Sequence, residues 1–352
     1  MRLPLLSTVL VVACSSAPGA APVGVDPGEG APGSDGKADG AGSGRAPGPT
    51  VPDVRCDGVP DAGPAGDFNH LSSEVISALG DPRHRGFDLV APASADTQSL
   101  EGWVSYTTAD KALEDEDVDV FACRDGAWAN LGRARTDNEG HFALPLAGDA
   151  RLPVAMRDLY LSVVGDRTGA GFLGYVAPDD QPLIVSDVDG TLTSSENAFF
   201  ETIALGIEPD AQPGAATAYQ DAATRGYQLV YVTARGGRYT SDTRTWLADL
   251  GFPRGPVRLS PSFLTLPGGD TIAYKSSTLT ALADALPVVM GIGNRASDIT
   301  AYADAGLAAD ATFVKLPEYQ SEVQAALDAG QAIGVTAYDD LRTVYIDALP
   351  PR

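Results

Sequence analysis

Two aspartates, one residue apart, follow a short apolar strand and are the first candidates for chemistry. The predicted strand 183–186 leads into Asp187 and Asp189, and Gly190 then permits a sharp turn. Because alternate side chains of a strand share a face, both carboxylates should leave the same sheet edge on the same side. Two unpaired carboxylates would repel each other, and a divalent cation held by oxygen ligands, Mg²⁺ in particular, would relieve that cost. A solvated acidic turn is the alternative for the pair alone; the longer string 183–193 favours a functional site.

Further polar residues follow other predicted strands. Thr233 and Ala234 stand at the end of the strand 227–233, Asn294 and Asp298 follow the strand 288–292, and Lys275 precedes a predicted helix start at 276. This half of the chain contains no histidine, so histidine acid–base chemistry is excluded and carboxylate chemistry with a metal is indicated. Taken singly, Thr233 could be a strand-end hydroxyl, Lys275 a surface charge and Asp298 a residue favoured by a helix dipole. Their order at successive strand ends favours one shared site.

The elements that must position these residues alternate between strands and helices from residue 182 onward. We expect strands over 183–186, 227–233, 257–259, 288–292 and 312–314, and helices over 215–225, 240–250, 276–285 and 297–305. Strands that are apolar throughout belong to a parallel sheet covered by helices on both faces. Ligands bind such sheets at the C-terminal strand ends, where the candidate residues lie. The pattern predicts a Rossmann-like α/β domain over 179–352.

Residues 68–178 have a different texture, typical of a small antiparallel β-sandwich. A short helix over 68–79 and a basic turn over 81–86 precede strands over 100–107, 118–123, 131–136, 141–145, 159–164 and 172–176. The Asp-Asn-Glu-Gly run at 137–140 predicts a hairpin turn, and 136–142 resemble a hairpin of transthyretin-like sandwiches. The chain's three histidines, His70, His84 and His141, all lie in this part, and we interpret them as structural or surface residues.

The first 14 residues have the features of a secretory signal. Arg2 precedes an apolar run over 3–12 that is too short to span a bilayer as a helix. The string 11–14 resembles the lipobox of bacterial lipoproteins, in which the cysteine, here Cys14, is lipidated. This predicts an extracytoplasmic lipoprotein anchored in a bacterial membrane, with plain secretion as the alternative.

The segment 15–67 is rich in Gly, Pro, Ala and Asp, which predicts a disordered tether between the anchor and the folded part. If Cys14 carries lipid, Cys56 and Cys123 remain. They form either one disulfide in an oxidising compartment or two buried thiols. Three cysteines without a C-x-x-C spacing exclude a thiolate zinc site.

Length and charge restrict the functional classes. At 352 residues the chain can form two domains, and its formal net charge of −23 argues against a nucleic-acid partner. The stretch 225–295 departs from this balance, since it holds eight basic and four acidic residues. A locally basic stretch fits an anionic substrate. We expect the protein to be a monomer.

The motifs together resemble those of the haloacid dehalogenase-like phosphatase superfamily. They are D-x-D-G-T at 187–191, the strand-end Thr233, Lys275, and G-N-x-x-x-D at 293–298. More narrowly, the strings at 187–193, 231–235, 255–261 and 293–298 resemble the LNS2 domain of lipin phosphatidate phosphatases. The same domain occurs in membrane-associated phosphatidylinositol transfer proteins, where the first aspartate is typically lost; this chain keeps Asp187. The resemblance covers about 180–330, roughly half of the chain.

The resemblance implies a role for each residue. Asp187 would attack phosphorus to form an aspartyl-phosphate, and Asp189 would protonate the leaving alcohol and then activate water. Thr233, Ala234 and Lys275 would bind the transferring phosphoryl group.

The resemblance also implies Mg²⁺ as the cofactor. The cation would be held by Asp187, the Asp189 carbonyl and Asp298, with Asn294 reaching it through water, and it would neutralise phosphoryl oxygens.

Spacing and anchor together favour a lipid substrate. Superfamily members that act on small metabolites usually carry a cap domain, but only 46 positions separate Asp187 from Thr233 and 42 separate Thr233 from Lys275. We therefore expect an uncapped site that hydrolyses a phospholipid phosphomonoester such as phosphatidate. Two alternatives stay open: a module that binds phosphatidate or phosphoinositide without turnover, and a general extracytoplasmic phosphatase on soluble or protein phosphomonoesters.

Overall fold

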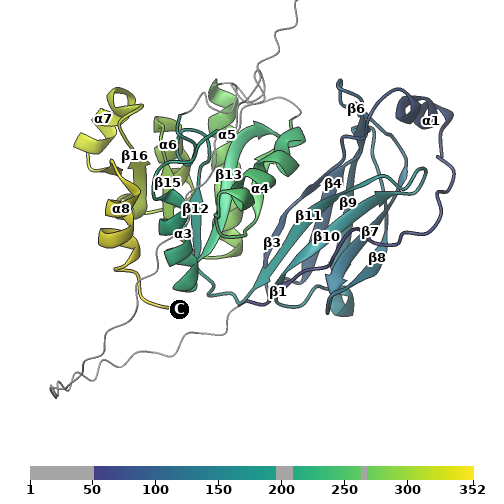
Figure 1. Cartoon of the computed structure of the whole chain (residues 1–352), viewed down its shortest axis with the longest axis horizontal. Helices are drawn as coiled ribbons and strands as arrows, with labels where there is room; N and C mark the ends of the chain where they lie inside the picture. The colour runs from purple at the N-terminus through teal and green to yellow at the C-terminus, as the bar shows by residue number, and fades with distance from the viewer. Residues whose placement is uncertain (1–50, 196–208, 263–267) are drawn as a thin grey trace, which may run out of the picture. The chain divides into compact units, whose positions relative to one another are not determined.

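The computed structural model describes residues 51–195, 209–262 and 268–352 (Figure 1). The predicted signal peptide, Cys14 and the tether up to residue 50 lie outside the described residues. None of the helices within those ranges is long and apolar enough to cross a membrane.

The end of the predicted tether is folded. Residues 51–67 contain strand β1 (Asp53–Val54), which pairs in parallel with β10 (Ala155–Val163). They also contain Cys56, which forms a disulfide with Cys123. Composition alone predicted a tether to residue 67, and this was wrong for the last part. A strand ladder and a covalent bond hold a segment in place without a large apolar side chain.

The described chain begins with a β-sandwich. The larger sheet has the strand order β3-β11-β10-β7-β8, with β1 attached to β10; the smaller sheet has the order β2-β4-β9. The other elements are α1 (Leu71–Ala78), β2 (Arg85–Phe87), β3 (Leu89–Pro92), β4 (Thr97–Trp103), the β5 (Ser105–Tyr106) and β6 (Lys111–Ala112) ribbon, β7 (Asp117–Arg124), β8 (Ala127–Arg135), β9 (His141–Ala147), η1 (Gly148–Ala150) and β11 (Gly169–Ala177). Buried apolar side chains of both sheets, among them Leu100, Val120, Phe142 and Leu161, form the core between them.

Two details of the sandwich differ from the prediction. The pairs β1–β10 and β3–β11 are parallel, so the larger sheet is mixed. The turn at 137–140 is present, with the Gly140 N–H donating to the Asp137 carbonyl over 3.1 Å, but it does not close a hairpin. β8 pairs with β7 and β9 pairs with β4, so the turn carries the chain from one sheet to the other.

The rest of the described chain is an α/β unit with a parallel six-stranded sheet of order β14-β13-β12-β15-β16-β17. Its strands are β12 (Leu183–Ser186), β13 (Gln228–Gly236), β14 (Val257–Ser260), β15 (Val288–Gly293), β16 (Thr312–Lys315) and β17 (Ile333–Val335). Strands are added on one side of β12 up to β14 and on the other side from β15 onward. The central strand β12 therefore lies at the topological switch point, where such sheets bind ligands.

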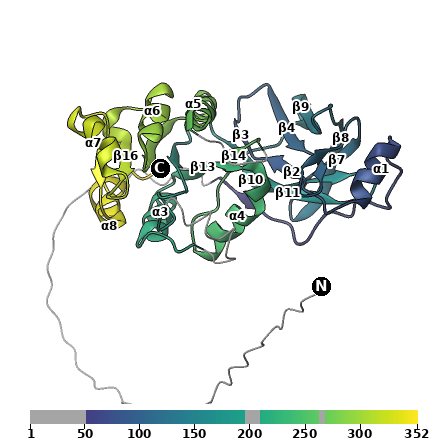
Figure 2. The ribbon, with the colours of Figure 1, turned by 90° about the horizontal axis from the view of Figure 1, so that it is seen from above.

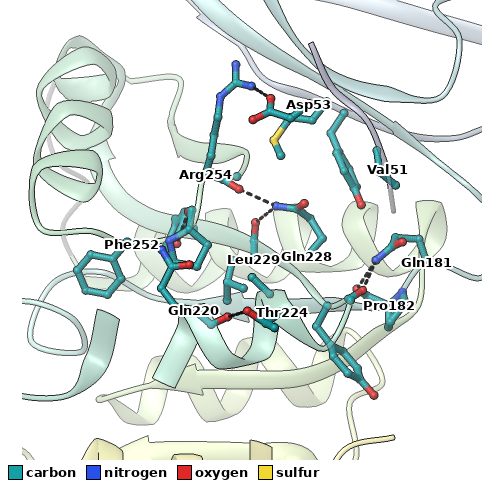
Figure 3. A pocket seen from close by; sticks show the side chains of 18 of the residues that line it. Val51, Asp53, Gln181, Pro182, Gln220, Thr224, Gln228, Leu229, Phe252 and Arg254 are labelled. Carbon is teal, nitrogen blue, oxygen red and sulfur yellow. Dashed lines mark hydrogen bonds and ion pairs between the residues drawn. The ribbon is translucent and has the colours of Figure 1, made fainter. Parts of the chain in front are cut away.

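Helices cover both faces of this sheet (Figure 2). One core holds side chains of α3 (Ala215–Thr224), α4 (Thr240–Asp249) and the C-terminal turns α8 (Tyr338–Asp340) and η4 (Leu341–Ile346). The core on the other face holds side chains of α5 (Gly268–Ala285) and α6 (Ala296–Asp304). The remaining helical elements are η2 (Gly237–Tyr239), η3 (Ala309–Ala311) and α7 (Gln320–Asp328). The fold prediction of a Rossmann-like parallel sheet preceded by a β-sandwich is confirmed.

The start of α5 differs from the prediction and bears on the site. The sequence predicts a helix from 276, whereas α5 begins at 268. Lys275 therefore lies inside a helix and not before one. The two glycines at 268 and 269 are poor helix formers, so the sequence carried no signal for helix before 276.

The sandwich and the α/β unit pack directly against each other. Asp88, which is fully buried, lies between β2 and β3. Its carboxylate accepts the N–H groups of Leu173 in the sandwich and Val257 in β14, both at 2.7 Å. It also pairs with Arg244 of α4 at 3.0 Å. One buried carboxylate thus joins the two folded parts next to the edge strand of the α/β sheet.

Candidate active site

The site begins at the end of the central strand β12. The Asp187 N–H donates to the Ile292 carbonyl over 2.9 Å, which continues the pairing with β15 by one residue. Gly190 then adopts a positive φ of 70°, a backbone conformation that costs a side-chain-bearing residue free energy. Its N–H donates to the Thr193 hydroxyl over 2.8 Å, which closes the turn. This turn leaves Asp187 and Asp189 at the C-terminal edge of the sheet.

A buried lysine bridges two carboxylates. The Lys275 Nζ lies 2.6 Å from Asp187 Oδ1 and 2.6 Å from Asp298 Oδ1. The three residues are 4 %, 6 % and 2 % exposed for Asp187, Lys275 and Asp298, so water screens the interaction weakly. Burial by itself would lower the pKa of Lys275, but the attraction of the two carboxylates outweighs it and the pKa is raised. Lys275 is therefore a fixed cation beside Asp187.

Asp187 is also held from its second oxygen. The Thr191 hydroxyl donates to Asp187 Oδ2 over 2.8 Å, and Thr191 is fully buried. Because different donors hold the two oxygens, the carboxylate plane has a defined orientation at the sheet edge. Such preorganisation is what a nucleophile requires.

Asp298 is positioned by the turn that links β15 to α6. Its Oδ2 accepts the N–H groups of Asn294 at 2.9 Å and Arg295 at 3.0 Å. Gly293 is needed for this approach, since a Cβ there would lie only 2.4 Å from the Asp298 Cβ. The spacing G-N-x-x-x-D therefore follows from a carboxylate that folds back onto the end of its own strand.

The Asp189 side chain forms a second cluster together with polar residues of β13. Arg235 Nη2 donates to Asp189 Oδ1 over 2.6 Å and Nε donates to Oδ2 over 2.9 Å. The Thr233 hydroxyl donates to Asp189 Oδ2 over 3.0 Å, and Arg235 Nη1 donates to Thr243 of α4 over 2.9 Å. Arg235 and Thr233 are buried, at 2 % and 0 % exposure. The geometry of this fork fits a bidentate arginine–carboxylate pair.

Arg235 was missed as a site residue by the sequence reasoning. The available signal was its position two residues after Thr233, on the same face of a strand that ends at the site. Two further predicted residues lie close to these groups. Ala234 is half-buried on β13 between these two partners, and Asn294 is buried with its backbone N–H on Asp298.

The donor set fits a divalent cation. In the described ranges no group of three or more His, Cys, Asp or Glu side chains is assembled as a metal cluster. Asp187 and Asp298 do meet, however, through the single ammonium of Lys275, which leaves one excess negative charge in a buried site. Mg²⁺ is often bound in this way, through one or two carboxylates while it keeps several waters. The oxygen atoms of Asp187, Asp298 and the Asp189 carbonyl could hold it.

Comparison with known proteins decides which family carries this geometry. Residues 184–315 match the family model of the LNS2 domain of PITM 1-3 proteins. The α/β unit is therefore similar to an LNS2 domain. Residues 82–176 match the β-sandwich domain of the same proteins. The resemblance to the LNS2 domain, as predicted from the motifs, is thereby confirmed.

Curated relatives of this chain include both transfer proteins and phosphatases. Membrane-associated phosphatidylinositol transfer protein 3 of Mus musculus is 26% identical over 265 residues, which are 73% of this chain and 26% of that protein. Phosphatidic acid phosphohydrolase 1 of Saccharomyces cerevisiae is 33% identical over 87 residues, 23% of this chain and 10% of that protein. Phosphatidate phosphatase LPIN1 of Homo sapiens is 28% identical over 155 residues, 40% of this chain and 17% of that protein. The chain spans about a quarter or less of each of these relatives.

Several solved structures, among them two phosphatases, have an arrangement similar to part of this chain. The D,D-heptose 1,7-bisphosphate phosphatase of B. bronchiseptica has a TM-score of 0.34 and 16% identity, and the match covers 48% of this chain and 99% of that one. A phosphoserine phosphatase in its apo form has a TM-score of 0.33 and 16% identity, with 46% of this chain and 98% of that one covered.

Proposed function

We propose that this protein is a Mg²⁺-dependent phosphatase that acts through an aspartyl-phosphate, with a phospholipid phosphomonoester such as phosphatidate as substrate. One observation carries the proposal: Asp187 is a buried carboxylate at the switch point of the sheet, with Lys275 on one oxygen and Thr191 on the other. A nucleophile and a fixed cation next to it are the parts that phosphoryl transfer needs.

In the first step an Asp187 oxygen attacks phosphorus and the bond from phosphorus to the substrate alcohol breaks. Asp189 gives a proton to the departing alkoxide, which leaves as the alcohol. Each oxygen of Asp189 already accepts hydrogen bonds from Arg235 or Thr233. Asp189 must therefore turn away from Thr233 to reach the leaving group, and this turn releases the Thr233 hydroxyl to bind the phosphoryl oxygens.

In the second step Asp189, now a carboxylate, takes a proton from water. The resulting hydroxide attacks phosphorus and the bond to Asp187 breaks, which releases inorganic phosphate and restores the carboxylate of Asp187 and the protonated acid of Asp189. Lys275 stays charged throughout, because its pKa is raised by the carboxylates beside it. It binds phosphoryl oxygens and offsets their negative charge in both steps. Mg²⁺, held by Asp187, Asp298 and the Asp189 carbonyl with Asn294 reached through water, would supply further charge neutralisation.

The lipid substrate is supported by the relatives and by the lack of a cap domain among the described residues. The names of two relatives state that they are phosphatidate phosphatases. The described residues between β12 and β13 form no separate cap domain. A lipid anchor on Cys14 and a location outside the cytoplasm belong to the same proposal. The disulfide between Cys56 and Cys123 favours such a location, because disulfides persist in oxidising compartments.

The rival function is lipid binding without turnover. It is favoured by the transfer-protein relatives, which share the largest part of this chain. The intact Asp187 and its two donors argue against it, because a binding module needs neither a nucleophile nor its orientation.

The test is phosphate release with Mg²⁺ and with EDTA, from phosphatidate in vesicles and from a soluble aryl phosphate. Wild type, Asp187→Asn and a control, Asp249→Asn on the exposed end of α4, would be compared. We expect Mg²⁺-dependent release from phosphatidate that falls at least about 10³-fold in Asp187→Asn and is unchanged in the control. Release from the aryl phosphate alone would favour a general phosphatase. No release from either substrate by the wild type would refute catalysis, and vesicle binding would then support the rival.

A further inference from the structure

A second cation near the catalytic edge has no counterion among the described residues. The guanidinium of Arg258, on β14, lies over the ring of Phe87 at 3.9 Å from its centroid. Among the described residues it makes no hydrogen bond or ion pair, and its Nε is buried without an acceptor. Burial lowers the pKa of Arg258, which is the expected cost of a cation that is desolvated without a paired anion.

The sheet register places Arg258 level with the nucleophile. Ser186 pairs with Tyr231, and Tyr231 pairs with Val257. One residue further along each strand, Asp187, Val232 and Arg258 form the next row, with side chains on the same face. Because neighbouring strands lie about 4.8 Å apart, the Cα atoms of Asp187 and Arg258 are about 10 Å apart.

That face carries α5, which touches both ends of the row. Lys275 of α5 contacts Asp187. The preceding residue, Tyr274, lies close enough to Arg258 that its phenol and the guanidinium affect each other's pKa. The nucleophile and the unpaired arginine therefore lie beside consecutive residues of one helix.

The acidic groups nearest to Arg258 are committed to other partners. Asp88 is occupied by two backbone N–H groups and Arg244, and Glu101 pairs with His141 at 3.3 Å. Phe87, the sandwich residue under Arg258, packs edge-on against Trp103 with the ring centroids 6.1 Å apart. Arg258 thus packs against the aromatic ring of Phe87, and no anion among the described residues neutralises its charge.

We propose that Arg258 binds a second negative group of the substrate. On this proposal, which rests on the proposed function, the preferred substrates are phosphomonoesters that carry another anionic group on the order of 10 Å from the reacting phosphorus. A glycerophospholipid whose headgroup joins a phosphodiester to a terminal phosphomonoester has this chemistry, and so does a soluble bisphosphate. Phosphatidate, with one phosphate, lacks it. The β-sandwich would take part in substrate selection through Phe87.

The test compares substrates with one and two anionic groups. The ratio of kcat/KM for butanediol bisphosphate to that for butyl phosphate would be measured in wild type, Arg258→Gln and Arg258→Lys. Arg342→Gln, which removes a partly exposed arginine paired with Asp221, is the matched control. We expect a ratio of about tenfold or more in the wild type, the Lys variant and the control, and a ratio near one in Arg258→Gln, because one charge-assisted hydrogen bond to phosphate is lost. The same ratio is then measured for lipids, as phosphate release from vesicles that contain phosphatidylglycerophosphate or phosphatidate. A ratio that depends on Arg258 in vesicles supports a lipid substrate, and one that depends on Arg258 only for the butyl compounds supports a soluble substrate.

An unchanged ratio in Arg258→Gln, or an equal loss on both substrates, would overturn the subsite. Binding measurements keep the proposal testable without turnover. If the wild type hydrolyses neither compound, the proposed function fails, and calorimetry with butane bisphosphonate and butylphosphonate tests Arg258 by the same ratio of affinities. Equal affinities of the wild type for these two compounds would then refute the anion subsite itself.

Discussion

Replacing Gly293 by alanine should remove activity by moving one carboxylate. A Cβ at this position would lie 2.4 Å from the Asp298 Cβ and 2.5 Å from its Cγ. Carbon atoms in contact lie about 3.5 Å apart, so Asp298 must retreat by about 1 Å. The backbone N–H groups of Asn294 and Arg295 hold its carboxylate in place, and the retreat would loosen these bonds and the contact with Lys275.

The magnitudes follow from this displacement. A misplacement of about 1 Å in a catalytic arrangement costs about 10²-fold in rate. The overpacking itself costs about 1–3 kcal/mol of unfolding free energy, which the domain should survive. We therefore expect kcat for an aryl phosphate to fall about 100-fold while the protein stays folded, as measured by phosphate release and by thermal unfolding monitored with circular dichroism.

Gly171→Ala is the matched control. It makes the same change on β11, where the nearest atom to the added Cβ is 3.9 Å away, and it should keep kcat within about twofold. If Gly293→Ala folds normally and keeps kcat within about threefold of the wild type, the position of Asp298 does not matter to the reaction and Asp298 is not part of the active site.

Three further predictions concern buried groups. Lys275→Met leaves Asp187 and Asp298 facing each other without an ammonium, so urea unfolding should report a loss of about 3–5 kcal/mol together with loss of activity; an unchanged stability would show that the bridge is not formed. Burial lowers the pKa of His84 from 6.5 to about 4. The unfolded state therefore binds the proton more strongly, and stability should fall by about 2 kcal/mol between pH 7 and pH 5. His84→Gln should reduce that slope, whereas an equal slope in the variant would assign it to other groups. Reduction of the Cys56–Cys123 disulfide, which spans 67 positions, should lower the unfolding free energy by about 4 kcal/mol; the Cys56→Ser variant should show the same loss and no further response to reductant.

Local pattern was enough to predict five of the six strands of the α/β sheet and the polar residues at their ends. The strands 183–186 and 312–314 stand out because they are buried on both faces and therefore apolar throughout. The polar residues that follow such strands, Asp187 and Thr233, gather at one edge because parallel strands end on the same side. The same logic did not reveal β17 or α7, whose short segments carry a weaker apolar signal.

The contacts within the site could not be predicted in this way. Lys275 meets Asp187 across 88 positions and Asp298 across 23, and Arg235 meets Asp189 across 46. Such pairs depend on which strands become neighbours and on how far a helix extends. The start of α5 at 268, and not at 276, is what places Lys275 inside the helix that lies over Asp187.

The sequence by itself determined the parallel α/β sheet, the β-sandwich before it and the order of the catalytic motifs, because each rests on periodicity and on residues close together in the chain. Only the tertiary structure decided that Asp187 shares Lys275 with Asp298, that Asp189 pairs with Arg235, and that Cys56 bonds to Cys123. The physical reason is that ion pairs and disulfides depend on distance in space, which strand order and helix packing set and local composition does not.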